Sequence, residues 1–429
     1  MSKWTEECIK EFADSFAGGT PSRSRSDYYH NGTIPWISSS EVNQPYIFDT
    51  FEKITQIGFE NSSAKWIPQN SVLVAMYGAT AGQVSKNLID ATSNQAVLAL
   101  VPKKNKIDGN FLYYQVKQNK DSILFLAQGS GQPNLSKDLI DNYKIKAPTD
   151  INEQLKISNI LFTADTVIDK TQAAITKYKA IKQGMLHDLY TRGIDIKTGK
   201  LRPLYTEAPG LYKESPLGWL PRDWDVERLG DIGMFKNGVN KGKSSFGYGT
   251  LFVNIIDAYP EILNCKTLGR VFINETEKHD YGLLKGDLIF VRSSVKPSGV
   301  GYNTLFVQYS EDVVFCGFMI RFRLNDKEKY SPEFYNSYFR FEEFRRRLIT
   351  SSTVSANTNI NQGALSNLLA IKPNENEQAE IILRLKTIDN KLQAEQKYLH
   401  KLQQLKSGLM GDLLNGIKEV IIKEEVQNG

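Results

Sequence analysis

The chain contains little cysteine and histidine, which limits the sites that it can form. It has 3 cysteines and 4 histidines in 429 residues. Cys8, Cys265 and Cys316 lie far apart in the sequence, which argues against a disulfide framework or a Cys-rich zinc site and is typical of a reducing compartment. The histidines form no His-x-x-x-His pair and no Cys/His cluster, so we expect no metal and no cofactor.

Long apolar runs and a strong excess of one charge are also missing. No segment reaches the roughly 18 apolar residues that a membrane helix needs, and residues 1–17 lack the apolar core of a signal peptide. The net charge of +5, from 53 Lys+Arg against 48 Asp+Glu, excludes a histone-like tail protein but permits local basic faces. We therefore expect a cytoplasmic globular protein of about two to four domains, without a membrane partner.

Motifs of covalent chemistry are absent from the sequence. The segment Gly238–Ser244 resembles a phosphate-binding loop, but three residues instead of four separate its glycines, and a flexible basic loop is the better interpretation. Glu395 and Lys397 have the spacing of some nuclease sites, yet they lie within a helical pattern that favours a solvated charged face. Neither a Gly-x-Ser-x-Gly turn nor a glycine-rich turn for a methyl donor is present, so we predict no catalytic residue.

The two halves of the chain repeat each other. Asn-Glu-Gln at 152–154 recurs 224 positions later at 376–378, and Gly184–Leu189 matches Gly408–Leu413 at the same offset. Upstream, Trp4 aligns with Trp224 and Gly18 with Gly238, at the nearby offset of 220. Matches at both ends of one segment indicate an internal duplication.

Heptads mark a helical segment in each copy. The apolar positions are Leu161, Ile168, Ile175 and Leu189 in the first copy, and Leu385, Leu392, Leu399 and Leu413 in the second. Lys182, the one polar break, maps onto Lys406. A narrow apolar stripe of this length predicts two helices that pack as a coiled coil, and two surface helices on separate cores are the alternative. Asn152 and Asn376 are the expected helix caps.

Short β-rich runs precede each helical segment. Ser71–Met76 and Ala96–Val101 in the first copy correspond in character to Leu288–Val291 and Met319–Leu324 in the second. The fold class is therefore α+β, with two similar mixed domains that arose by duplication and two long helices. The predicted boundaries are mixed domains at 1–148 and 222–370, helices at 149–190 and 371–415, an extended and partly stiff linker at 191–221, and a peripheral tail at 416–429.

Three pairs of polar loops occupy equivalent places in the two copies. The first pair combines hydroxyl, amide and cationic side chains, which suit phosphates and base edges but also occur on ordinary surfaces. Its candidate residues are Thr20, Ser22, Arg23, Arg25 and Tyr28 in the first copy, and Lys236, Asn237, Lys241 and Lys243 in the second.

The second pair follows a predicted strand, where small residues let a backbone approach a ligand, and a tight turn without a ligand is the alternative. Its candidates are Tyr77, Gly78, Thr80 and Gln83, and then Arg292, Ser293, Ser294 and Lys296. The third pair precedes the last predicted strand of each copy, and its candidates are Gln128, Ser130, Gln132 and Asn134, and then Ser351, Ser352 and Asn357.

Arginines are concentrated in one further segment. Arg340, Arg345, Arg346 and Arg347 are expected to form a cationic helix face that suits phosphates. Glu342 and Glu343 dilute its charge, so a solvated face is the alternative.

Several short motifs occur in a characteristic order: Gly-Gly-Thr-Pro-Ser at 18–22, Met-Tyr-Gly-Ala-Thr-Ala-Gly at 76–82, Pro-Leu-Gly-Trp-Leu-Pro-x-x-Trp at 216–224, and Asn-Glu-Gln at the start of both helical segments. In these motifs the chain resembles the DNA-specificity subunits of Type I restriction–modification systems, over nearly its whole length. The second copy departs from the pattern, because Arg292–Gly299 replaces the Gly-Ala-Thr-Ala-Gly turn and Gly-Gly-Thr-Pro-Ser is absent.

The resemblance implies two target-recognition domains, each reading one half of a split, asymmetric sequence in double-stranded DNA. The two long helices would form an antiparallel coiled coil that separates the domains and docks two methyltransferase (modification) subunits. Restriction (translocase/endonuclease) subunits would join that core, and the chain itself would be non-catalytic. A coiled-coil scaffold for protein ligands and the recognition subunit of a Type IIB-like system are the alternatives.

Overall fold

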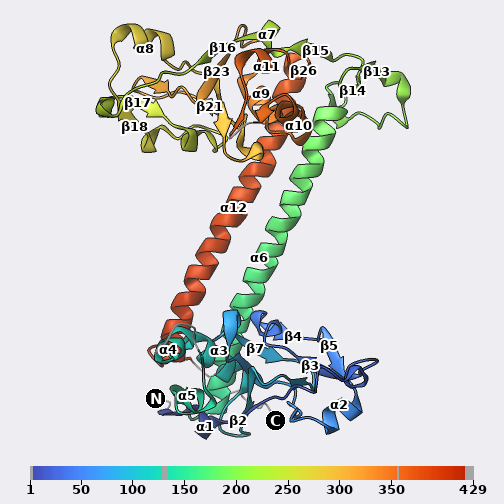
Figure 1. The fold of residues 1–429 in the computed structure, drawn as a ribbon, viewed down its shortest axis with the longest axis vertical. Helices are drawn as coiled ribbons and strands as arrows, with labels where there is room; N and C mark the ends of the chain where they lie inside the picture. The colour runs from blue at the N-terminus through green and yellow to red at the C-terminus, as the bar shows by residue number, and fades with distance from the viewer. Residues whose placement is uncertain (1–2, 128–133, 355–356, 421–429) are drawn as a thin grey trace, which may run out of the picture. The chain divides into compact units, whose positions relative to one another are not determined.

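The chain folds into two compact units. The computed structural model describes residues 3–127, 134–354 and 357–420 (Figure 1). Unit 1 comprises Met1–Ala174 with Glu395–Gly429, and unit 2 comprises Ile175–Ala394. The two long helices, α6 (Ile151–Thr191) and α12 (Glu375–Leu414), each contribute to both units. Within the described ranges, no helix combines the length and the apolar character needed to cross a membrane.

Unit 1 is built on a five-stranded sheet in the order β2-β9-β6-β7-β4. These strands are β2 (Ala13–Ala17), β9 (Val97–Pro102), β6 (Val72–Ala75), β7 (Val84–Asn87) and β4 (Tyr46–Ile47). Two smaller sheets join β5 (Glu52–Ile54), β3 (Ile34–Ile37) and β8 (Thr92–Ser93), and β1 (Trp4–Cys8) with β10 (Lys144–Pro148). The helices are α1 (Ile9–Phe12), α2 (Gln56–Glu60), α3 (Gly109–Gln118), α4 (Lys120–Leu126) and α5 (Lys137–Asp141).

Unit 2 contains a four-stranded sheet in the order β16-β23-β19-β21. These strands are β16 (Gly233–Asn237), β23 (Met319–Leu324), β19 (Asp287–Val291) and β21 (Asn303–Phe306). A second sheet joins β18 (Gly269–Val271), β17 (Phe246–Val253) and β22 (Val313–Phe315), and β15 (Asp225–Arg228) pairs with β26 (Leu369–Lys372). The helices are α7 (Leu229–Ile232), α8 (Glu275–Tyr281), α9 (Pro332–Tyr338), α10 (Glu342–Thr350) and α11 (Gln362–Ser366).

The two units share one strand order. The series β2-β9-β6-β7 in unit 1 corresponds to β16-β23-β19-β21 in unit 2, and every neighbouring pair in both series is antiparallel. In the sheets β5-β3-β8 of unit 1 and β18-β17-β22 of unit 2, the central strand has one antiparallel and one parallel neighbour. This agreement confirms the predicted α+β class with two similar mixed domains.

The segment between α6 and β15 differs from the extended linker predicted at 191–221 from its prolines. It forms two hairpins, β11 (Ile194–Asp195) with β12 (Lys200–Leu201), and β13 (Tyr212–Ser215) with β14 (Gly218–Pro221). Gly199 and Gly218 adopt φ values of +65° and +93°, which permit the tight reversals that proline spacing alone does not reveal.

The long helices pack against each other through the predicted apolar stripe. Six of the eight predicted heptad positions are buried, namely Leu161, Ile175, Leu189, Leu385, Leu392 and Leu413, and Ile168 and Leu399 are half-buried. In unit 1, Lys406 near the end of α12 pairs with Asp165 of α6, whereas in unit 2 Lys182 near the end of α6 pairs with Asp389 of α12. The helices therefore run antiparallel within each unit, and each polar break carries an ion pair.

The repeated Asn-Glu-Gln motif ties each long helix to its own mixed domain. Gln154 is fully buried, accepts a hydrogen bond from the Asp108 backbone N–H (2.7 Å), and donates to the Pro148 carbonyl (2.8 Å). Gln378 repeats this arrangement by accepting from the Ser331 N–H (2.9 Å) and donating to the Pro373 carbonyl (2.8 Å). In both units, the glutamine therefore provides a hydrogen-bond partner for a backbone N–H and a backbone carbonyl at equivalent places.

The expected helix caps are wrong by two residues. Asp150 Oδ1 accepts from the Asn152 N–H (2.9 Å) at the start of α6, and Asn374 Oδ1 accepts from the Glu377 N–H (3.0 Å) at the start of α12. α6 begins at Ile151 and α12 at Glu375, two residues before the starts that the expected caps imply and two and four residues after the predicted boundaries at 149 and 371. The short polar residue before each helix caps the free N–H groups.

Candidate nucleic-acid interface

Two arginines of the first candidate loop in unit 1 lie flat on aromatic rings. Arg23 donates to both carboxylate oxygens of Glu52 (2.7 and 2.8 Å), and its guanidinium lies 4.5 Å from the Tyr29 ring centroid. The hydrogen bond to Glu52 is the main reason that the pKa of Arg23 is raised. Arg25 donates to Asp27 in the same bidentate manner (2.8 and 2.7 Å) over the ring of Tyr28. Both cations are exposed and held in a defined orientation.

The remaining residues of this loop are hydroxyl-bearing or buried. Thr20 donates to the Gln95 side chain, and the Ser22 and Ser24 hydroxyls lie 2.8 Å apart. Tyr28 is buried, so its ring supports Arg25 and is a poor candidate for direct contact with a ligand.

The first candidate loop in unit 2 is neutralised by α8. Lys236 pairs with Asp280 (3.1 Å) and lies 5.0 Å from the Tyr281 ring centroid. Lys241 pairs with Glu277 (2.7 Å), which lowers the pKa of that carboxyl through its hydrogen bond. Lys243 is exposed in a 3₁₀ turn (Lys243–Ser245), and Asn237 is half-buried at the end of β16.

The second candidate loop in unit 1 is a tight turn with an exposed tyrosine at its start. Gly78 and Gly82 have φ values of +76° and +77°, which explains the glycine requirement of this turn. Tyr77 is 40% exposed and Thr80 is half-buried. Gln83 accepts a hydrogen bond from Lys120 (3.4 Å).

The corresponding loop in unit 2 combines strand pairing with exposed side chains. Ser293 and Ser294 form the short strand β20, which pairs with β25 (Thr358–Asn359), and β25 pairs with β24 (Thr353–Val354). The second and third candidate loops of unit 2 therefore lie in one small sheet. Lys296 is exposed at the following turn, and Arg292 donates to the Gly317 carbonyl (3.5 Å).

The third candidate loops give a mixed outcome. Gln128, Ser130 and Gln132 lie outside the described residues, whereas Asn134 is exposed beside Leu135, whose N–H donates to the Met76 carbonyl (2.9 Å). In unit 2, the hydroxyls of Ser351 and Ser352 donate to carbonyls of the last turn of α10 (2.9 and 2.6 Å). Asn357 is exposed. Ser351 and Ser352 thus already serve to end a helix.

A short turn brings the first and second loops together in each unit. In unit 1, Gln95 accepts from Thr20 while the neighbouring Ala96 carbonyl accepts from the Met76 N–H (2.8 Å). In unit 2, the Gly317 N–H donates to the Val239 carbonyl (2.9 Å) and the Phe318 carbonyl accepts from the Arg292 N–H (2.9 Å). Gln95 and Phe318, which is 58% exposed, were missed by the sequence analysis, and their place just before a predicted strand was the available signal.

The predicted cationic helix face is wrong. Arg345 is only 8% exposed, and Arg347 donates inward to the Leu369 carbonyl and the Tyr338 hydroxyl (both 2.9 Å). Arg346 is exposed, and Arg340 lies in the turn between α9 and α10. The amphipathic helix α10 buries Phe344 and Leu348, and this orientation carries Arg345 into the protein.

The loops offer hydroxyl and amide groups beside two kinds of cation: Arg23, Arg25, Lys236 and Lys241 pair with carboxylates, whereas Lys243 and Lys296 are exposed. Phosphate oxygens and base edges present the complementary acceptors and donors. The role of each loop residue in binding stays a prediction.

Residues 1–179 match a family model described as the Type I restriction modification DNA specificity domain. The chain is 24% identical over 403 residues to the Type I restriction enzyme MjaVIII specificity subunit of Methanocaldococcus jannaschii, covering 90% of this chain and 86% of the relative. It is 28% identical over 179 residues to the EcoR124I/EcoR124II specificity subunit of Escherichia coli, covering 41% and 44% of the two chains.

A solved structure has a similar fold. The crystal structure of a Type I restriction–modification system S subunit from M. genitalium matches with a TM-score of 0.55 at 15% identity, covering 96% of both chains. At this identity the likeness concerns the fold alone.

Proposed function

We propose that the chain is the DNA-recognition subunit of a Type I restriction–modification complex, because residues 1–179 match the model of the Type I restriction modification DNA specificity domain and a Type I specificity subunit is similar over 90% of the chain. Each mixed domain, 1–148 and 222–370, reads one half of a bipartite target in double-stranded DNA. The chain is non-catalytic, and its partners supply methylation and cleavage.

The observation that carries this proposal is one strand order with two sets of loops. The sheets β2-β9-β6-β7 and β16-β23-β19-β21 place their loops at equivalent positions. The residues of these loops nevertheless differ: a turn in unit 1 consists of Gly78–Thr80, and the equivalent turn in unit 2 consists of Pro297–Gly299. A common scaffold with different polar side chains is expected of two readers of different half-sites, so the target is asymmetric.

The paired helices α6 and α12 set the distance between the half-sites. Their apolar stripe and their two equivalent ion pairs fix one register, which supports a defined spacing. Their outer faces dock two methyltransferase subunits, and restriction subunits join the resulting core.

Affinity and sequence choice arise from different groups. Phosphates attract cations such as Arg23 and Lys241. These cations pair with Glu52 and Glu277 in the free chain, and on DNA binding a phosphate replaces the carboxylate or lies beside the ion pair. Amides and hydroxyls of the loops then select bases through their edges.

Exchange of residues 1–148 for the same domain of another specificity subunit tests the modular assignment. The methylation pattern of a host that carries the complete complex is read by methylation-sensitive sequencing. One half-site is expected to change while the other is retained, because unit 2 keeps its own loops. If both half-sites changed, or neither did, the modular assignment would fail.

A coiled-coil scaffold for protein ligands is the competing function. A mobility-shift titration with random duplex DNA between 50 and 200 mM salt distinguishes the two functions. Over this range, a protein with several phosphate contacts loses affinity for DNA by about a thousandfold or more. A scaffold binds DNA weakly or with no such dependence. A Type IIB-like system shares the recognition logic and is distinguished by the partner that co-purifies.

A further inference from the structure

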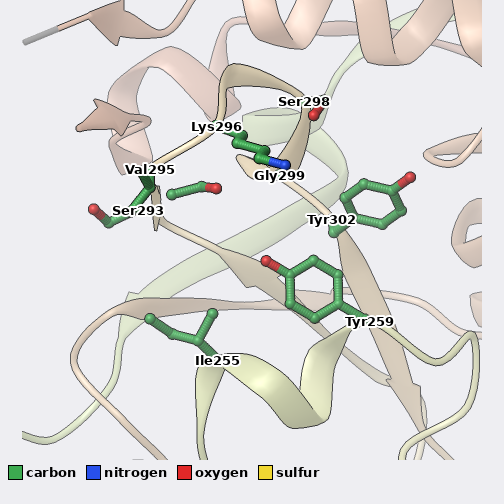
Figure 2. Close-up of a pocket in the computed structure, with 9 residues that line it drawn as sticks. Ile255, Tyr259, Ser293, Val295, Lys296, Ser298, Gly299 and Tyr302 are labelled. Atoms are coloured by element: carbon green, nitrogen blue, oxygen red, sulfur yellow. The ribbon is translucent and has the colours of Figure 1, made fainter. Parts of the chain in front are cut away.

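Unit 2 contains a cavity of about 550 Å³ beside the second candidate loop. It lies between the 3₁₀ turn Ile255–Ala258, the segment Ser293–Gly299 and Tyr302. The rings of Tyr259 and Tyr302 lie across the cavity from Ser293 and Val295 (Figure 2). The volume is within the range of small-ligand sites, of roughly 300–1,000 Å³.

The walls combine flat aromatic surface with hydroxyl groups. The Tyr259 and Tyr302 ring centroids are 5.6 Å apart with an interplanar angle of 55°, and Ile255 and Val295 add apolar surface. Ser293, Ser294 and Ser298 contribute hydroxyls, each of which can donate or accept a hydrogen bond. Lys296 is exposed at the rim. A planar heterocycle with polar edges and an attached anion fits such walls.

Buried Arg345 and half-buried Arg340 contact residues that line the cavity. Arg345 donates to the Ser298 carbonyl (2.8 Å) and lies 4.5 Å from the Tyr302 ring centroid, while its buried Nη1 has no hydrogen-bond partner in the described part of the chain. Arg340 donates to the carbonyls of Tyr259 (2.9 Å) and Asn303 (3.1 Å). Burial lowers the pKa of both arginines. Positive charge held by carbonyl groups creates a field that favours an anion near the rim.

The aromatic walls are specific to unit 2. Gly82 and Gly301 occupy equivalent turns, with φ values of +77° and +66°, and an added Cβ would collide with Leu124 of α4 or Leu348 of α10, respectively. The next residue, directly before β7 or β21, is Gln83 in unit 1 and Tyr302 in unit 2. The two turns therefore share a backbone conformation, but unit 1 presents an amide at this point and unit 2 presents an aromatic ring.

We propose that this cavity receives a single nucleobase displaced from the stack of the DNA that unit 2 binds, and this inference rests on the proposed function. The base lies against Tyr259 and Tyr302, its edge meets the serine hydroxyls, and its phosphate lies near Lys296. Displacing a base from the stack costs free energy, and stacking of that base on aromatic side chains offsets part of the cost.

The test uses the full chain and duplexes of random sequence that carry one central bulged 2-aminopurine, with fully paired duplexes as the reference. A bulged base is already partly unstacked, so the chain is expected to bind the bulged duplex about tenfold more tightly. Binding is measured by fluorescence anisotropy, and 2-aminopurine emission reports the stacking of the base.

Three variants identify the ring that is responsible. Tyr302→Leu is expected to reduce the preference to within about twofold, since stacking is lost, whereas Tyr302→Phe keeps it. Tyr205→Leu removes a tyrosine that stacks on Trp219 (4.3 Å) outside the cavity and should leave the preference intact. Thermal melting of each variant verifies folding.

The outcomes separate this inference from the proposed function. Salt-dependent binding without any preference for the bulge, or a preference that Tyr302→Leu retains, overturns the base site and leaves DNA recognition standing. Loss of the preference only in Lys296→Ala would assign the cavity to phosphate alone and also overturn the inference. Failure to bind either duplex would instead contradict the proposed function.

Discussion

Two equivalent glutamates differ in their surroundings although they occupy the same place in the repeat. Glu377 is fully buried and accepts hydrogen bonds from Arg202 (2.5 and 3.0 Å), the Trp224 indole (2.9 Å) and a backbone N–H (2.7 Å). Glu153 is 2% exposed, and its Oε2 has no hydrogen-bond partner among the residues that the structure describes.

Glu377→Gln is expected to lower the free energy of unfolding by about 3 kcal/mol, because breaking a buried ion pair leaves the other charge uncompensated. Arg202 is 8% exposed, and among the described residues the exposed Asp223 would then be its one carboxylate partner. Urea denaturation followed by tryptophan fluorescence measures the change.

Glu153→Gln provides the matched control. It removes a charge that has no ion pair within residues 3–127, 134–354 and 357–420, so the free energy of unfolding should change little or rise. A loss as large as that of Glu377→Gln would mean that Glu153 has a stabilising partner, contrary to this interpretation.

Sequence reasoning at this scale found the residue types but not their partners. Arg23 and Lys241 were recognisable as cations in polar loops, yet their carboxylates, Glu52 and Glu277, are 29 and 36 positions away. Arg345 was assigned to the surface because charge alone does not reveal which side of a helix packs inward. Tyr259 and Tyr302 were overlooked, since aromatic residues in loops carry no local pattern.

At the scale of elements, the ion pairs of α6 and α12 define the register of the helix pair. The Lys406–Asp165 pair is largely buried, with side-chain exposures of 14% and 20%, and the equivalent Lys182–Asp389 pair is more open at 24% and 39%. Polar groups inside an apolar stripe disfavour shifted registers, in which they would be unpaired.

Lys406→Asp combined with Asp165→Lys is expected to recover stability that each single change loses. A double-mutant cycle should give a coupling energy of about 1 kcal/mol, as for other residues in direct contact. Lys397→Asp, which alters an exposed charge of α12, controls for the change in net charge. A coupling energy near zero would remove the register role of this pair.

The elements themselves were largely predictable from the sequence. Heptads are a local signal, so α6 and α12 were found, and short β-rich runs located β6, β9, β19 and β23. The pairing of β1 with β10 joins residues about 140 positions apart, and the hairpin β13–β14 depends on one positive-φ glycine. Such non-local pairings and turn conformations leave little trace in a single sequence.

At the scale of the whole molecule, the proposed function implies that the length of α6 and α12 sets the number of base pairs between the two half-sites. Insertion of one heptad into both α6 and α12 preserves the apolar stripe and adds about 10 Å of helix. The permitted gap between half-sites should then grow by roughly three base pairs, at 3.4 Å per base pair.

Methylation-sensitive sequencing of a host that carries the altered complex measures this gap. Both half-site sequences should be unchanged, because the loops of the two units are untouched. A changed half-site sequence with an unchanged gap would contradict a spacing role for the helices.

The composition of unit 1 has a consequence for how the protein is made. Its core contains Ile157 and Leu161 together with Met410, Leu413 and Leu414, and Gln115 donates to the Leu414 carbonyl (2.7 Å). Unit 2, by contrast, is one continuous stretch that ends at Ala394. On the ribosome, the domain that is translated first therefore waits for the last helix before its core can close, while the second is complete earlier. A premature stop codon before residue 410 would accordingly damage the domain encoded farthest from it.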